Sequence, residues 1–230
     1  MDQYLTKTNC INCKRSSTCF TQRIDYCKDF FFLEKAHINF KKGETIIKEG
    51  TFVSSIYFVL EGLVKVYLEG PNKNVIIKII KSNDFLGLTS LFGDNTYYFS
   101  ATALSDTTIC SIDLDVIKRL LSENCKFTQE IVKWYCGNYN LMFTKCFNLG
   151  QKQLNGKLAS ILLYLNEDKF KSENIYSHLT RKDLAELSGM APESVARILS
   201  KFNDDKIIKL KGKKVEILNM ELLKSIDKNG

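Results

Sequence analysis

Four cysteines lie within the first 27 residues of this 230-residue chain, and three of them follow the spacing C-x2-C-x5-C. These three are Cys10, Cys13 and Cys19, and the fourth is Cys27. Thiolates are soft ligands for iron–sulfur clusters and zinc, so the spacing indicates a metal centre or thiol redox chemistry. No apolar signal core precedes them and no run approaches a membrane span, so we expect a cytoplasmic protein with no membrane partner.

A second stretch that could do chemistry, HLTRKDLAELSGMAPESVARILSKF, begins at His178. Thr180 with Asp183 predicts a capped helix start, and Pro192 suits the first turn of a second helix after SGMA. Two helices joined by a short turn with glycine form the helix-turn-helix pattern, and a hairpin around residues 211–214 would be its wing. A small helical domain that never touches DNA can look similar, but the exposed charges favour DNA. The residues expected to contact DNA are Glu193, Ser194, Arg197, Lys201, Lys213 and Lys214.

Two of these side chains have the donors and acceptors to read bases. Arg197 can donate a bidentate pair to guanine O6 and N7, and Glu193, one turn earlier, can accept from a cytosine amino group. Lys213 and Lys214 would add salt-dependent phosphate contacts. The balance of 33 basic against 26 acidic residues agrees with a nucleic-acid face.

Three zones of different periodicity must position these groups. Short runs rich in β-branched and aromatic residues, broken by glycines, extend from about residue 38 to 114 and predict an antiparallel β domain. A long helical pattern follows, and then the helix-turn-helix zone. We therefore expect a cysteine-rich arm at 1–30, a β sensor domain at 31–122, a long helix at 123–152 and a DNA-binding domain at 153–230.

Apolar residues recur every three or four positions along the long helix and give it one apolar stripe. The stripe either packs on the neighbouring domain or forms the coiled-coil-like seam of a homodimer, and the sequence leaves both open. As a dimer interface it would comprise Phe127, Ile131, Tyr135, Tyr139, Met142, Cys146 and Leu149.

In this order of parts the chain resembles the CRP/FNR family of bacterial transcription regulators. The resemblance is carried by KKGETIIKEG, by the strand from Phe58 to Val66 and by the helix-turn-helix stretch quoted above. It implies an α+β fold: a double-stranded β-roll sensor like the cyclic-nucleotide-binding domain, a long dimerisation helix and a winged helix-turn-helix. It also implies a homodimer on palindromic DNA with TGA-type half-sites, and leaves RNA polymerase as a candidate partner. No Gly-rich phosphate loop or nucleophile–base pair suggests an enzyme.

Cyclic AMP is not expected to be the signal. Family members that bind it carry a Glu after the Gly of an F-G-E motif and an Arg-Ser pair about ten residues on. Here Leu88 follows Gly87, and Tyr97 and Tyr98 stand where the Arg-Ser pair would fall. The stretch holds no cation for a phosphate.

The N-terminal cysteines resemble those of FNR-type oxygen sensors, which hold a [4Fe–4S] cluster with three cysteines of this spacing. A fourth ligand lies at the end of the roll in that branch, where this chain has Cys110. The resemblance implies a cluster on Cys10, Cys13, Cys19 and Cys110, with Cys27 as the alternative fourth ligand. The cluster would tie the arm to the segment before the dimer helix and so bias the pairing of the two helices.

Other signals stay open. Four thiolates would equally suit zinc or a thiol redox switch, nitric oxide could attack the same cluster, and a small molecule could occupy the roll. FNR-type proteins whose dimerisation needs the cluster carry a carboxylate on the interface side of the helix. Met142 stands at that place here, so the metal-free protein could stay dimeric.

Overall fold

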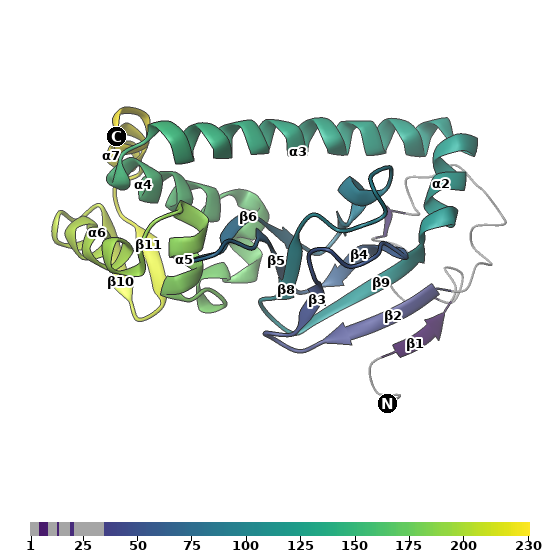
Figure 1. Ribbon diagram of the computed structural model, residues 1–230. Coiled ribbons are helices and arrows are strands. Elements are labelled where there is room, and N and C mark those ends of the chain that lie inside the picture. The colour runs from purple at the N-terminus through teal and green to yellow at the C-terminus, as the bar shows by residue number, and fades with distance from the viewer. Residues whose placement is uncertain (1–4, 9–12, 14–18, 21–34) are drawn as a thin grey trace. The chain divides into compact units, whose positions relative to one another are not determined.

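The computed structural model describes residues 5–8, 13, 19–20 and 35–230, and predicted ligands Cys10 and Cys27 lie outside them (Figure 1). The chain forms two compact units. One contains residues up to 69 together with 78–139, and the other contains residues 70–77 and 140–230. Among the described residues, no helix has the length and apolar character needed to cross a membrane.

The first unit is built on two antiparallel sheets, as the β-rich zone predicts. The larger has the order β1-β2-β9-β4-β7, and the smaller has the order β3-β8-β5-β6. Figure 1 shows β2 lying between β1 and β9. The strands of the larger sheet are β1 (Leu5–Thr8), β2 (Lys35–Phe40), β9 (Thr107–Asp113), β4 (Ser55–Glu61) and β7 (Asp84–Leu86). Those of the smaller sheet are β3 (Thr45–Ile47), β8 (Ser100–Ala103), β5 (Leu63–Leu68) and β6 (Val75–Lys81).

A tight turn at Gly62 separates β4 from β5. Its backbone φ of 95° is one that residues with a side chain rarely adopt. A β-carbon there would lie 2.5 Å from the carbonyl oxygen of Asp106. The turn lets the segment 55–68 contribute β4 to the larger sheet and β5 to the smaller one. This arrangement, followed by a long helix and a helix-turn-helix, confirms the predicted fold class.

The helices α2 (Leu114–Glu123) and α3 (Cys125–Gln151) follow β9 directly. The side chain of Asp113 caps α2 by accepting a hydrogen bond of 2.8 Å from the backbone N–H of Asp115. Asn124 separates the two helices, and its side-chain oxygen accepts from the N–H of Phe127 at 2.9 Å. A chain leaving β9 therefore enters α3 after one short, capped helix.

The dimer interface prediction is wrong for Phe127 and Ile131. These side chains are 3% and 4% exposed and belong to the hydrophobic core of the first unit. Tyr135 is half-buried in the same unit, and its hydroxyl donates to the carbonyl oxygen of Leu88. The first turns of the stripe thus pack on their own domain, which was the other interpretation of the pattern. Tyr139, Met142 and Cys146 are exposed.

The second unit contains the helix-turn-helix. Thr180 and Asp183 form a complete capping box at the start of α5, Gly189 ends that helix with a φ of 68°, and Pro192 opens α6. The wing is the β10–β11 hairpin, in which Lys211 pairs with Lys214. The elements are α4 (Leu154–Leu165), η4 (Asp168–Glu173), η5 (Ile175–Ser177), α5 (Arg181–Ser188), α6 (Pro192–Asp204), β10 (Ile208–Lys211), β11 (Lys214–Ile217) and α7 (Met220–Asn229).

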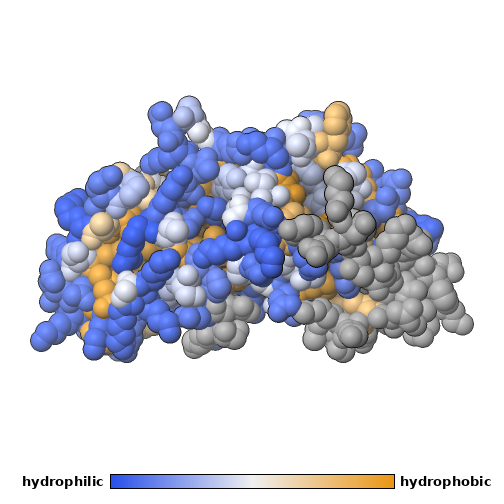
Figure 2. Space-filling model, turned by 90° about the horizontal axis from the view of Figure 1, so that it is seen from below, coloured by the Kyte–Doolittle hydropathy of each residue, from blue (hydrophilic) through white to orange (hydrophobic). Residues whose placement is uncertain are grey.

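Hydrophilic side chains cover most of the described surface that Figure 2 shows, and hydrophobic side chains fill narrower areas between them. The apolar side chains of α6 are among those taken into the core: Val195, Ile198, Leu199 and Phe202 are at most 2% exposed. The charged side chains of the same helix are left on the surface.

Candidate metal centre and DNA-contacting surface

A single row of registered residues crosses the larger sheet and contains Cys110. Cys110 on β9 pairs with His37 on β2 and with Phe58 on β4. The row continues to Thr6 on β1 and to Phe85 on β7. Directly paired residues of antiparallel strands project from the same face, so His37, Cys110 and Phe58 share one face of the sheet.

The arm contacts this row on both sides of Cys110. The sulfur of Cys13 lies 3.8 Å from Nε2 of His37. The ring of Phe20 lies 5.1 Å from that of Phe58, between centroids. Cys19, the residue before Phe20, is 8% exposed and belongs to the same hydrophobic core as Cys110, which is 6% exposed. Cys13 therefore lies beside the cross-strand partner of Cys110, and Cys19 is buried in the core to which Cys110 also belongs.

The chemistry of these side chains fits a thiolate-ligated group. Cys13, Cys19 and Cys110 are soft donors, and Cys10, whose position is not described, is separated from Cys13 by two residues. Within residues 5–8, 13, 19–20 and 35–230, no three His, Cys, Asp or Glu side chains are grouped closely enough to hold a metal ion. The described residues bring the donors to one region without forming a closed site.

The three residues that the sequence compares with nucleotide contacts of the family, Leu88, Tyr97 and Tyr98, are all uncharged side chains. Leu88 is completely buried, and Tyr97 is 4% exposed with its hydroxyl donating to the carbonyl oxygen of Ser55. Burial raises the pKa of Tyr97, so this side chain stays neutral. A phenol has no positively charged form to hold a phosphate. Tyr98 is exposed and donates to Asp94.

The predicted DNA-contacting residues lie at the surface of the second unit. Glu193, Arg197 and Lys201 are exposed on α6, on the side opposite its buried residues, and Ser194 is half-buried. Lys213 and Lys214 are exposed at the tip of the wing.

Two lysines, which the sequence analysis does not single out, hold the turn between α5 and α6. Nζ of Lys145 donates to the carbonyl oxygen of Leu187, and Nζ of Lys73 donates to that of Gly189 at 2.7 Å. Lys145 is 9% exposed, and burial lowers its pKa to about 8. The spacing Leu141–Lys145–Leu149 on α3 is the signal that could have identified a lysine on an inward face.

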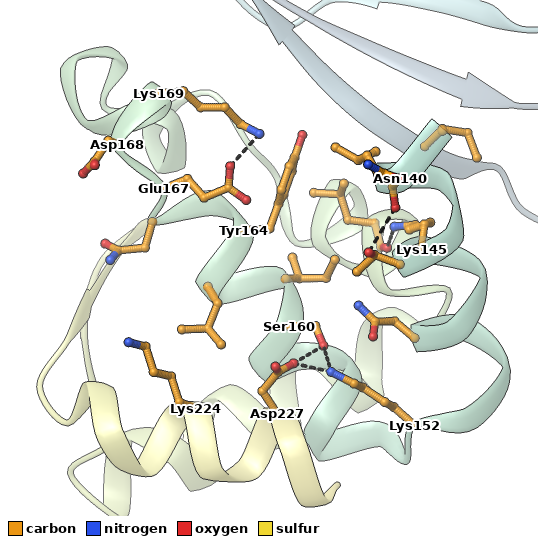
Figure 3. A pocket seen from close by; sticks show the side chains of 18 of the residues that line it. Asn140, Lys145, Lys152, Ser160, Tyr164, Glu167, Asp168, Lys169, Lys224 and Asp227 are labelled. Carbon is orange, nitrogen blue, oxygen red and sulfur yellow. Dashed lines mark hydrogen bonds and ion pairs between the residues drawn. The ribbon is translucent and has the colours of Figure 1, made fainter. Parts of the chain in front are cut away.

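A cleft of about 1090 Å³ lies in the second unit, beside Lys145. Some of its polar side chains bond to one another (Figure 3): Lys152 pairs with Asp227, which also accepts from the hydroxyl of Ser160. A separate ion pair joins Nζ of Lys169 to Oε2 of Glu167 at 2.6 Å. The bonds of Asp227 join α7 to α4 and to Lys152, the residue that follows α3.

Comparisons with known proteins agree with this architecture. The cyclic nucleotide-binding domain family matches residues 37–124, and the Crp-like helix-turn-helix domain family matches residues 156–226. The fumarate and nitrate reduction regulatory protein of Vibrio cholerae is 25% identical over 184 residues, which cover 78% of this chain and 73% of the relative. A CRP-like cAMP-activated global transcriptional regulator of Mycobacterium tuberculosis is 24% identical over 191 residues, which cover 81% of this chain and 85% of that relative.

A solved structure shares the fold. FixK2 from Bradyrhizobium japonicum superposes with a TM-score of 0.74 at 19% sequence identity, covering 85% of this chain and 98% of that one. The two domain matches together span more than half of the chain, and the relatives are transcription regulators rather than enzymes. The chain belongs to the CRP/FNR family of dimer-forming, DNA-binding transcriptional regulators.

Proposed function

We propose that this protein is a homodimeric regulator that binds palindromic DNA and responds to oxygen or redox state. The response would depend on a [4Fe–4S] cluster held by Cys10, Cys13, Cys19 and Cys110. The observation that carries the proposal is the registered row through Cys110, which the arm contacts at His37 and at Phe58. When bound, such a cluster supplies an oxidisable centre that oxygen or nitric oxide can attack.

The protein's own residues would hold the arm in place and connect it to the long helix. Phe20 anchors the arm among Phe58, Phe85 and Phe127, with ring centroids 4.9 to 5.9 Å apart. Cys110 lies three residues before Asp113, which caps α2. A change in how the arm sits on β9 therefore acts close to the start of the helices that would carry the dimer contact, as a two-state switch requires.

In the DNA-bound dimer, α6 of each protomer would enter the major groove. Arg197 would read guanine and Glu193 cytosine in a TGA-type half-site, while Lys201, Lys213 and Lys214 would contact phosphates. Ser194 lies between Glu193 and Arg197 in the sequence, and its hydroxyl could form a hydrogen bond with a base. A half-site separation of about one helical turn follows from two-fold symmetry.

A second candidate is a regulator with a structural zinc or a thiol switch. It is favoured by the contact between Cys13 and His37, because a mixed sulfur and imidazole donor set suits zinc. Cyclic AMP is not proposed as the signal, because Leu88, Tyr97 and Tyr98 stand where the resemblance would require a Glu and an Arg-Ser pair.

The test is anaerobic purification followed by iron, sulfide and zinc analysis, with a visible spectrum and DNA binding measured before and after air. We expect about four irons and four sulfides per chain, a spectrum that bleaches in air, and weaker DNA binding afterwards. Cys110→Ser should lose the iron, whereas Cys136→Ser, which changes an exposed cysteine of α3, should keep it. A colourless protein with one zinc and DNA binding indifferent to air would favour the second candidate.

A further inference from the structure

His37 lies outside the cysteine spacing, yet the structure puts it in contact with a cysteine of the arm. It is half-buried on β2, and its Nε2 lies 3.8 Å from the sulfur of Cys13. Its cross-strand partner is Cys110. One imidazole therefore adjoins two of the four thiols assigned to the metal centre.

The strand register fixes the side from which His37 projects. Cys110 pairs directly with His37, and directly paired residues of antiparallel strands project from the same face. His37 must therefore share the face of Cys110. The register of β2 on β9 therefore places the imidazole on the face where Cys13 contacts it.

We propose that His37 is a positioning residue for Cys13. In the tautomer with its proton on Nε2, the ring donates to the sulfur and keeps the arm beside Cys110. The inference rests on the proposed function, since it concerns the same thiols. Hydrogen bonds to ligating sulfurs stabilise the more negative state of a cluster, so loss of this donor should lower the reduction potential and speed oxidation.

The experiment compares wild type with His37→Leu and His37→Gln, all purified anaerobically. His178→Leu is the matched control, because it changes the chain's other histidine, half-buried in the second unit. Iron per chain, midpoint potential and the rate of bleaching in air are measured. We expect His37→Leu to bleach about tenfold faster at a lower potential, the factor that loss of one hydrogen bond to a charged group produces. His37→Gln, which keeps an N–H donor, should recover most of the difference.

A second readout needs no metal. In chelator-treated protein, the rate at which a maleimide labels Cys13 is followed by peptide mass spectrometry, and His37→Leu should label faster than wild type. If anaerobically purified wild type contains no iron, the proposed function is wrong. The labelling experiment would still test the contact between Cys13 and His37. Unchanged labelling would overturn the inference. So would a His37→Gln variant as defective as His37→Leu, because it would show that an imidazole ligand, rather than a donor, is required.

Discussion

Nζ of Lys145, on the long helix α3, donates a hydrogen bond to the carbonyl oxygen of Leu187, in the last turn of α5. Lys73 makes the equivalent contact to Gly189, two residues on. The last carbonyls of a helix lack partners within it, so they can accept hydrogen bonds from lysine side chains. The turn that orients α6 is thus held by two residues that are distant from it in the sequence.

The buried ammonium of Lys145 predicts a pH dependence. Its pKa falls to about 8 in the folded protein, below its ordinary value of 10.5, so between these values the unfolded chain binds more protons. Stability should therefore rise as pH increases from 8 to 10.5, by about 3 kcal/mol at about 1.4 kcal/mol per pKa unit. Chemical denaturation at both pH values measures it. Lys145→Met should lack this rise, and Lys224→Met, at an exposed position in the same unit, should retain it.

Arg197→Ala should weaken binding to a TGA-type palindrome by about 1–3 kcal/mol per half-site and relax discrimination at the guanine it reads. Lys214→Ala should instead weaken binding to all sequences and reduce the slope of log K against log salt by about one. Fluorescence anisotropy over a salt series separates the two effects. A Lys214→Ala variant with an unchanged slope would place the wing away from the phosphates.

The exposed apolar side chains of α3 predict which face a partner helix covers. Val132, Tyr139, Phe143 and Phe147 are between 54% and 65% exposed and follow one another at steps of seven, four and four. A charge on this face would be buried without a partner in a dimer, so Phe143→Asp should give monomers in analytical ultracentrifugation. Lys133→Glu changes the charge of the same helix at an exposed polar position and should leave the dimer intact. A Phe143→Asp dimer would exclude this face.

Phe20→Ala tests the anchor of the arm. The ring is 6% exposed and contacts three other phenylalanines, so its removal should cost about 3–5 kcal/mol if the cavity does not collapse. The loss should appear as earlier urea unfolding of the sensor unit and as faster labelling of Cys19. Phe52→Ala, at an 82% exposed phenylalanine, should change neither measurement.

Local chemistry could be predicted from the sequence, and choices between surfaces could not. The Thr180–Asp183 capping box depends on residues three positions apart, so its prediction is confirmed by the structure. An apolar stripe states only that something covers it, and for Phe127 and Ile131 the cover is their own domain. The contact between Cys13 and His37 joins residues 24 positions apart. The pairing of His37 with Cys110 depends on the register of two strands that are far apart in the chain. No short motif encodes either relationship.

The position of Cys110 in its sheet has a consequence for the life of the protein. β9 is the middle strand of five, hydrogen-bonded to β2 on one side and β4 on the other. A modification that distorts this strand cannot be absorbed by a surface loop and must loosen both neighbours together. We expect irreversible oxidation of Cys110 to expose the sheet to proteases and shorten the half-life of the chain. Oxidised molecules would then be degraded rather than repaired. The abundance of the protein would therefore fall after exposure to the oxidant.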